Sequence, residues 1–161
     1  MYNSAKILQN IFLLLAFAFM IGACDSNRIY EKNIVIPDGK WEVGFKPSFE
    51  FEIQDTTIFY NFYINLRNNT DYPYSNLYLF VDSYLADGSN ARDTIEVMLA
   101  TKEGKWLGKG IGKIKESRFF LRRNLVFPNK GKYSIDIEQA MRGDYLPGIE
   151  DIGIRIEKSK L

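Results

Sequence analysis

The sequence contains no histidine and only one cysteine, Cys24, and these two absences exclude several classes of function. Without histidine there is no Ser-His-Asp triad, no imidazole acid or base, and no histidine-ligated metal. One cysteine cannot form a disulfide, a cysteine-rich zinc site or a redox pair within the chain. The folded part must therefore be stabilised by its apolar core.

An excess of charge of one sign is also missing. The 161 residues include 21 basic and 20 acidic side chains. Lys6 is the only charged side chain before Cys24, so the remainder of the chain is neutral. Binding to phosphate backbones needs a basic excess, and we expect no nucleic acid among the partners. The length suits one domain.

One apolar run lies near the start of the chain. Residues 11–23 carry no charge and follow Lys6. A spanning helix needs about 20 apolar residues, so this 13-residue run indicates an export signal instead. Gly22 and Ala23 are small enough to lie extended in a peptidase cleft. We therefore predict a signal helix over residues 1–23, cleaved before Cys24.

The segment Ile21-Gly22-Ala23-Cys24 resembles the lipobox of bacterial lipoproteins. In that class the cysteine thiol receives a diacylglyceryl group, and cleavage leaves the cysteine as the first residue. Two or more acyl chains hold a protein stably at a membrane. The alternative is an ordinary signal peptide with an incidental, unpaired cysteine. We predict lipidation, including palmitate, at Cys24.

A short polar stretch follows Cys24, and we assign residues 24–33 to the lipidated terminus and a tether. Surface-exposed lipoproteins of the Bacteroidetes often carry an acidic cluster after the cysteine. Here Asp25 is the only acidic residue before Glu31. This favours an outer-membrane lipoprotein that faces the periplasm.

From Ile34 onward, apolar and polar residues alternate with a period of two, which is typical of antiparallel strands with one buried face. Turn residues separate the runs. We predict an all-β antiparallel sandwich, Ig-like or jelly-roll-like, of eight or nine strands over residues 34–161. Residues 137–142 could instead form a short helical turn. The clearest alternating runs are 49–53, 58–66, 77–81, 95–99, 133–137 and 152–156.

A glycine-rich loop over residues 108–113 lacks the spacing of a phosphate-binding loop, and it predicts a flexible hairpin or a strand bulge. The region around it is locally basic. It could contact an acidic partner or anionic lipid headgroups, or it could be a solvated edge protected by charge. The basic side chains are Lys102, Lys105, Lys109, Lys113 and Lys115.

Two groups of carboxylates could suggest chemistry. Glu50 and Glu52 share one strand face, whereas a glycosidase needs carboxylates on opposite sides of a cleft. Oxygen ligands could hold calcium, but the spacing of the acids at residues 82, 87 and 93 matches no EF-hand loop. Hairpin ends are the simpler interpretation. We predict no catalytic residue, no cofactor and no metal site.

Aromatic residues make up 15% of the chain, and Tyr72 and Tyr74 lie on either side of Pro73 between two apolar strands. Tyrosine is favoured at interfaces because it buries a large area at little cost in rotamer entropy. We predict that both rings are exposed and bind a partner. The alternative is that both fold back and close one end of the sandwich.

Two segments carry a family resemblance, Asn-Asn-Thr-Asp-Tyr-Pro-Tyr-Ser-Asn-Leu-Tyr at residues 68–78 and Leu-Pro-Gly-Ile-Glu-Asp-Ile-Gly at residues 146–153. With the lipobox and the length, the chain resembles the GldH family of gliding-motility lipoproteins of the Bacteroidetes. The resemblance implies a non-enzymatic envelope lipoprotein that works beside a secretion and motility apparatus by binding proteins. Only Cys24 carries over as a functional position. A glycan-binding lipoprotein that uses exposed aromatics is the alternative.

Overall fold

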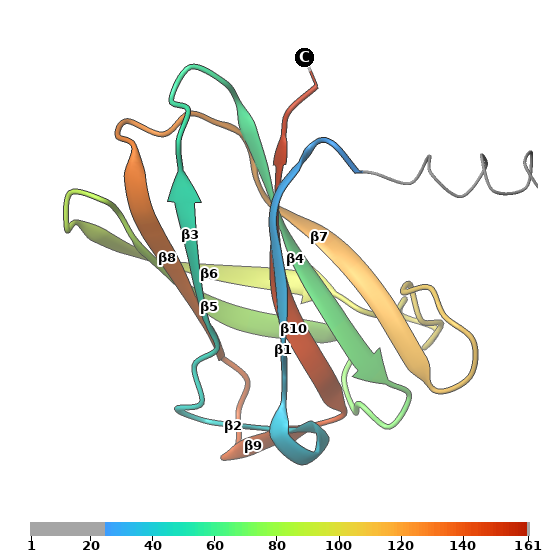
Figure 1. The fold of residues 1–161 in the computed structure, drawn as a ribbon. Helices are drawn as coiled ribbons and strands as arrows, with labels where there is room; N and C mark the ends of the chain where they lie inside the picture. The colour runs from blue at the N-terminus through green and yellow to red at the C-terminus, as the bar shows by residue number, and fades with distance from the viewer. Residues whose placement is uncertain (1–24, 161) are drawn as a thin grey trace, which may run out of the picture.

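The computed structural model describes residues 25–160, which form antiparallel β structure with one short 3-10 turn (Figure 1). Within this range there are ten strands, two of them only three residues long. The elements are β1 (Arg28–Val35), η1 (Pro37–Gly39), β2 (Lys40–Glu42), β3 (Ser48–Ile53), β4 (Tyr60–Asn69), β5 (Asn76–Tyr84), β6 (Asn90–Met98), β7 (Ile114–Leu125), β8 (Gly131–Gln139), β9 (Tyr145–Pro147) and β10 (Ile149–Lys158).

Two four-stranded sheets face each other, which confirms the predicted sandwich. The first sheet has the order β1-β10-β4-β7, and the second has the order β3-β8-β5-β6. The short pair β2-β9 closes one end. Aromatic rings join the two layers, since Phe51 of the second sheet lies 5.6 Å from Phe62 and 5.7 Å from Tyr30, both of the first sheet.

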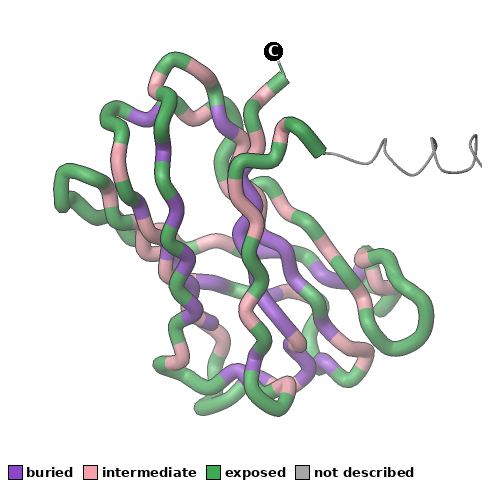
Figure 2. Tube along the Cα trace, viewed as in Figure 1, coloured by how far each residue is buried: buried purple, intermediate pink, exposed green. Residues whose placement is uncertain are grey.

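The alternation in the sequence becomes the inner and outer sides of each strand. In β3, Phe49, Phe51 and Ile53 are buried between the sheets, whereas Glu50 and Glu52 are exposed. Figure 2 shows buried segments following one another along the facing strands. Each large apolar side chain that is fully buried contributes roughly 1.5–3 kcal/mol, so this pattern supplies most of the driving force for the fold.

The two ends of the sandwich differ in what they carry (Figure 1). At the proximal end, the start of β1 meets the end of β10, where the Lys158 amide donates to the Asn27 carbonyl at 2.9 Å. The distal end holds η1, β2, β9 and the loop between β4 and β5. The described chain therefore begins and ends at one end of the domain.

The structure departs from the sequence-based expectation in three places. The first sheet begins at Arg28 rather than at Ile34, because β1 pairs with β10 and takes up most of the predicted tether. The alternative of a helical turn over residues 137–142 is wrong, since β8 continues to Gln139 and the Ala140 amide donates to the Tyr78 carbonyl. Strand β7 was not among the predicted runs.

The signal segment, its cleavage point and Cys24 lie outside the described residues. Residues 25–160 contain no helix long and apolar enough to cross a membrane.

Candidate functional surfaces

At the distal end, the two segments that carry the family resemblance lie against each other. The Asn69 amide donates to the Gly148 carbonyl at 2.9 Å, and Asn69 Nδ2 donates to Glu150 Oε1 at 2.7 Å. Gly148 has a φ of 84°, and a Cβ there would lie 2.7 Å from the Tyr72 amide nitrogen. The close approach of the two loops therefore requires glycine at this position.

An ion pair between a half-exposed arginine and a buried aspartate holds the same end of the sheet. Arg67 of β4 donates to the carboxylate of Asp151 on β10, and the Asp151 side chain is fully buried. Hydrogen bonding to Asp151 raises the pKa of Arg67. Removing Arg67 would leave the buried Asp151 carboxylate without a charged partner, so the pair keeps the strand ends that carry the distal loops together.

The β4–β5 loop buries one and exposes the other of the two tyrosines that the sequence predicted to act together. Tyr72 is only 3% exposed, its hydroxyl donates to the Asn76 carbonyl at 2.7 Å, and burial raises its pKa. Tyr74 is 43% exposed and meets the Tyr72 ring edge-on at 5.7 Å. The expected exposure of both rings is thus wrong for Tyr72, which closes the end of the core, and Tyr74 alone is available to a partner.

This difference gives a stability prediction. We expect Tyr72→Ala to lower the free energy of unfolding by about 3–5 kcal/mol, because it leaves a cavity in the core. Tyr74→Ala should change it by no more than about 0.5 kcal/mol, as at other exposed sites. Urea unfolding of the two variants measures the contrast. Equal losses would mean that Tyr74 is part of the core as well.

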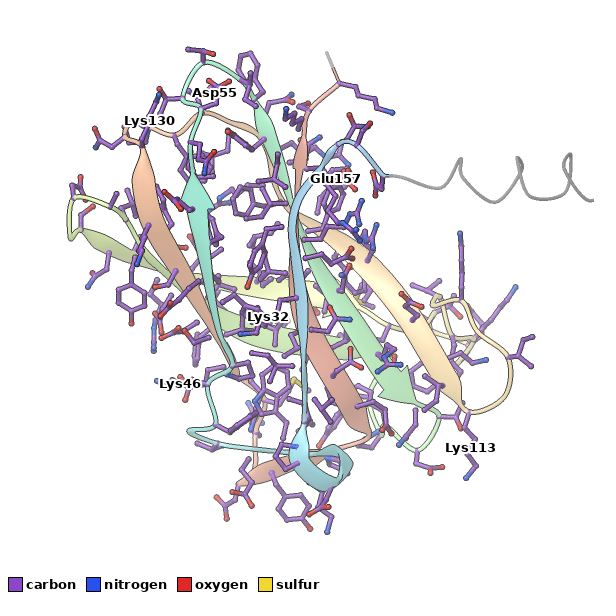
Figure 3. All side chains as sticks on the ribbon, in the orientation of Figure 1. Lys32, Lys46, Asp55, Lys113, Lys130 and Glu157 are labelled. Atoms are coloured by element: carbon purple, nitrogen blue, oxygen red, sulfur yellow. The ribbon has the colours of Figure 1, made fainter. Side chains whose placement is uncertain are left out.

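The glycine-rich loop forms a hairpin that reaches the distal end. Lys109 and Glu116 exchange backbone hydrogen bonds of 2.8 and 2.7 Å, and a Cβ on Gly110 would lie 2.4 Å from the Ile114 carbonyl oxygen. Residues 110–114 at the tip of the hairpin are exposed. Lys113, labelled in Figure 3, lies 3.5 Å from Asp71 of the β4–β5 loop. The basic hairpin therefore adjoins the loop that carries Tyr74.

The remaining carboxylates do not gather into a catalytic or metal-binding group. Glu50 and Glu52 point to solvent from β3. Asp82 accepts two hydrogen bonds from Arg92, and Asp93 accepts one from Arg122, so guanidinium groups neutralise both. Over residues 25–160, no three acidic, histidine or cysteine side chains are placed to hold a metal ion.

An apolar pocket of about 180 Å³ opens between the sheets near the end of β7. The ion pair between Arg122 and Asp93 lies among its lining residues. Its volume is close to that of cavities that admit a benzene-sized group, and its walls offer no nucleophile with an adjacent base. The ring-bearing side chains of its walls are Phe51, Phe62, Tyr84, Phe127 and Tyr133.

At the proximal end, a charge cluster ties the start of the described chain to the first sheet. The Arg155 side chain is 6% exposed and donates to Glu31 and Glu157 at 2.5 Å each, and also to Asp25. Arg118 reaches Glu31 from β7 at 3.1 Å. Sequence reasoning missed this cluster. The feature that could have indicated it is Arg155 itself, a charged residue between two isoleucines of an isoleucine-rich strand.

The hydrogen bonds within the cluster shift the pKa values of its members so that each one stays charged. Burial alone would lower the pKa of Arg155, but hydrogen bonds to Asp25, Glu157 and Glu31 outweigh it and raise that pKa. The hydrogen bond from Arg155 lowers the pKa of Asp25. Burial would raise the pKa of Glu31, yet its hydrogen-bond donors, Arg28 and Arg155 first, lower it. Asp25 is thus held as a carboxylate.

Comparison with known proteins decides the family. The model of the family described as GldH lipoprotein matches residues 28–156, most of the chain. The chain belongs to the GldH lipoprotein family. It is therefore a lipoprotein of a gliding-motility family, and such a protein is held at a membrane of the cell envelope.

Relatives named for gliding motility match nearly full length. The gliding motility lipoprotein GldH homolog of Christiangramia forsetii is 38% identical, over 93% of this chain and 96% of that protein. The gliding motility lipoprotein GldH of Flavobacterium johnsoniae is 33% identical, over 94% and 98% of the two chains.

Likeness among solved structures is weak. The VP2 subviral particle of infectious bursal disease virus has a TM-score of 0.35 and 18% identity, over 83% of this chain and 34% of that one. Dimeric latent PorU of Porphyromonas gingivalis has a TM-score of 0.34 and 10% identity, over 83% and 13%. These values add nothing to the family assignment.

Proposed function

We propose that this GldH-family lipoprotein is a non-enzymatic component of an assembly associated with gliding motility and secretion. Its anchor is the lipid on Cys24, and its partners are other envelope proteins. The observation that carries the proposal is the distal end, where residues 68–78 and 146–153 meet and present Tyr74. Loops at the end of a rigid sandwich are where such domains place binding residues.

The position of the anchor supports this assignment. Cys24 directly precedes Asp25, which lies at the proximal end, so a lipid on Cys24 would be attached at the end of the sandwich opposite the β4–β5 loop that carries Tyr74. The distal loops then project away from the membrane that holds the lipid. In the outer membrane, with the domain facing the periplasm, these loops would be accessible to other periplasmic components.

The distal end also combines the features expected of a protein-binding surface. Tyr74 offers an exposed ring on a loop held by Gly148 and by the buried Tyr72. The basic hairpin beside it is held to this loop by the ion pair of Lys113 with Asp71. The same hairpin adds positive charge through Lys109 and Lys115. A rigid aromatic residue surrounded by charge favours a specific contact, because little conformational entropy is lost on binding.

Affinity capture from envelope extract tests the proposal. Wild-type protein should retain one or more envelope proteins, and Tyr74→Ala should lose them while its stability stays unchanged. Tyr84→Ala is the matched control, because Tyr84 is 39% exposed on the β5–β6 hairpin, away from the distal end. Loss of the same proteins from both variants, or from neither, would contradict binding through the distal end.

Sugar-array binding of the same two variants addresses the glycan alternative. If the wild-type protein binds a glycan and Tyr74→Ala does not, glycan recognition replaces protein recognition as the role of this loop. If no glycan is retained, the capture result stands alone.

A further inference from the structure

The start of the described chain is fixed to the outer face of the first sheet. Asp25 bonds to Arg155, which is itself held by Glu31 and Glu157. Figure 3 shows Glu157 beside the point where the described chain begins. Consecutive Cα atoms are about 3.8 Å apart, so the acyl chains proposed on Cys24 would leave the protein at this face.

Aromatic rings and arginines are stacked on the same face. Tyr63 of β4 and Phe120 of β7 are cross-strand partners with ring centroids 4.4 Å apart, and Phe120 is 48% exposed. The guanidinium of Arg123 lies 3.7 Å from the centre of the Phe120 ring, and that of Arg118 lies 5.9 Å from the centre of the Tyr63 ring. We call Tyr63, Arg118, Phe120 and Arg123 the arginine–aromatic patch.

The arginine–aromatic patch adjoins Asp25, the first described residue of the chain. Asp25 and Tyr63 line one polar hollow together with Glu157, Lys158 and Lys160. Among residues 25–160, Arg123 forms no ion pair with a carboxylate, and neither do the two lysines. Free positive charge and an exposed ring therefore lie next to the site of lipid attachment.

We infer that the arginine–aromatic patch lies against the headgroup layer of the membrane that holds the anchor. The inference rests on the proposed lipidation of Cys24. Aromatic side chains favour the membrane–water interface, where their apolar area leaves water. Arginine binds phosphate groups through a planar set of donors, and basic side chains near an anionic surface add attraction. The patch provides both, at the place where the acyl chains emerge.

This contact would set the orientation of the domain. The sheet face that carries β4 and β7 would rest on the bilayer near its proximal end, and the distal loops would remain in solution. The lysine-rich hairpin could not make the same contact at the same time, because it lies at the other end of the sandwich beside Asp71.

Site-specific quenching on the mature lipoprotein tests the inference. With the Cys24 thiol occupied by lipid, Phe120→Cys carries the only free thiol and can be labelled with an environment-sensitive fluorophore. The protein is placed in vesicles of phosphatidylethanolamine and phosphatidylglycerol. We expect the label at residue 120 to be quenched by spin-labelled lipid and shielded from iodide. A label introduced by Ile111→Cys at the distal hairpin should show the reverse.

A charge substitution sharpens the test. Arg123→Gln in the Phe120→Cys background should reduce lipid quenching severalfold, whereas Lys113→Gln, the matched distal control, should leave it unchanged. Equal quenching at residues 111 and 120 would overturn the inference. So would shielding from iodide without lipid quenching, which would mean that a protein covers the patch.

Mass spectrometry of the mature protein shows whether Cys24 carries lipid, and this distinguishes failure of the membrane contact from failure of the proposed anchor. If Cys24 is lipidated but the label at residue 120 is not quenched by lipid, only the inferred membrane contact is overturned. A Cys24 without lipid would overturn the anchor and the membrane contact together.

Discussion

Replacing Cys24 with alanine is expected to abolish lipid attachment and to leave an uncleaved precursor. The thiol is the only group in Ile21-Gly22-Ala23-Cys24 that can form the thioether, and the signal matches a class in which cleavage follows lipidation. Growth with labelled palmitate, followed by immunoprecipitation, measures both effects. The wild-type protein should carry the label and migrate as the shorter form, whereas Cys24→Ala should do neither.

Cys24→Ser is a sensitive companion variant, because it keeps the size of the residue and removes only the thiol. It should behave as Cys24→Ala does. Palmitate label in either variant would contradict lipidation at Cys24 and would place the acyl chain on another residue.

Arg155→Met is expected to have the largest effect on stability outside the apolar core. The substitution keeps the length of the side chain but leaves three carboxylates facing one another without their shared guanidinium. Removing one partner of a buried ion cluster costs 3–5 kcal/mol, and we expect about 3 kcal/mol here because Glu31 and Glu157 retain partial contact with water. Urea unfolding measures this loss of free energy.

Arg92→Met is the matched control for this variant. Arg92 also pairs with a carboxylate, that of Asp82, but its side chain is 48% exposed. The loss there should be much smaller, because water screens an exposed ion pair. Arg155→Met should in addition release Asp25 and make the adjoining backbone more susceptible to proteolysis, which Arg92→Met should not do. Similar losses in both variants would show that the Arg155 cluster has no special role.

The strands that could be predicted from the sequence are those in which buried residues recur at every second position. In β3, apolar residues alternate with polar ones and lie between the sheets, and in β5 every second residue, Leu77, Leu79 and Val81, is buried there. Successive side chains of any extended strand point to opposite faces, so this period can be recognised without knowing which strands are neighbours in the sheet.

Two edge strands were not predictable in the same way. β7 has a single strand neighbour, β4, and none of its residues is fully buried. Arg118, Arg122 and Arg123 are among them. β1 is similarly polar and pairs only with β10, more than a hundred residues later in the chain. These two edge strands bury few apolar side chains and so leave no clear periodic signal, whereas β3, which is also an edge strand, buries three apolar side chains in strict alternation.

The candidate sites show the same division. Tyr72 and Tyr74 are two residues apart, and alternation alone would place them on one side. The turn at Pro73 and the contact with Gly148 instead bury one ring and expose the other. Their separate roles depend on a loop from the far end of the sequence, which no local pattern contains.

The sequence by itself predicted the export signal and the lipobox, and it determined the all-β class and the lack of histidine chemistry, because each depends on residue type and short-range spacing. Only the tertiary structure decided that residues 68–78 meet residues 146–153, and that Arg155 joins Asp25 across a separation of 130 residues. Contacts of this kind follow from which strands become neighbours in a sheet. That choice is made by the packing of the whole core rather than by any single segment.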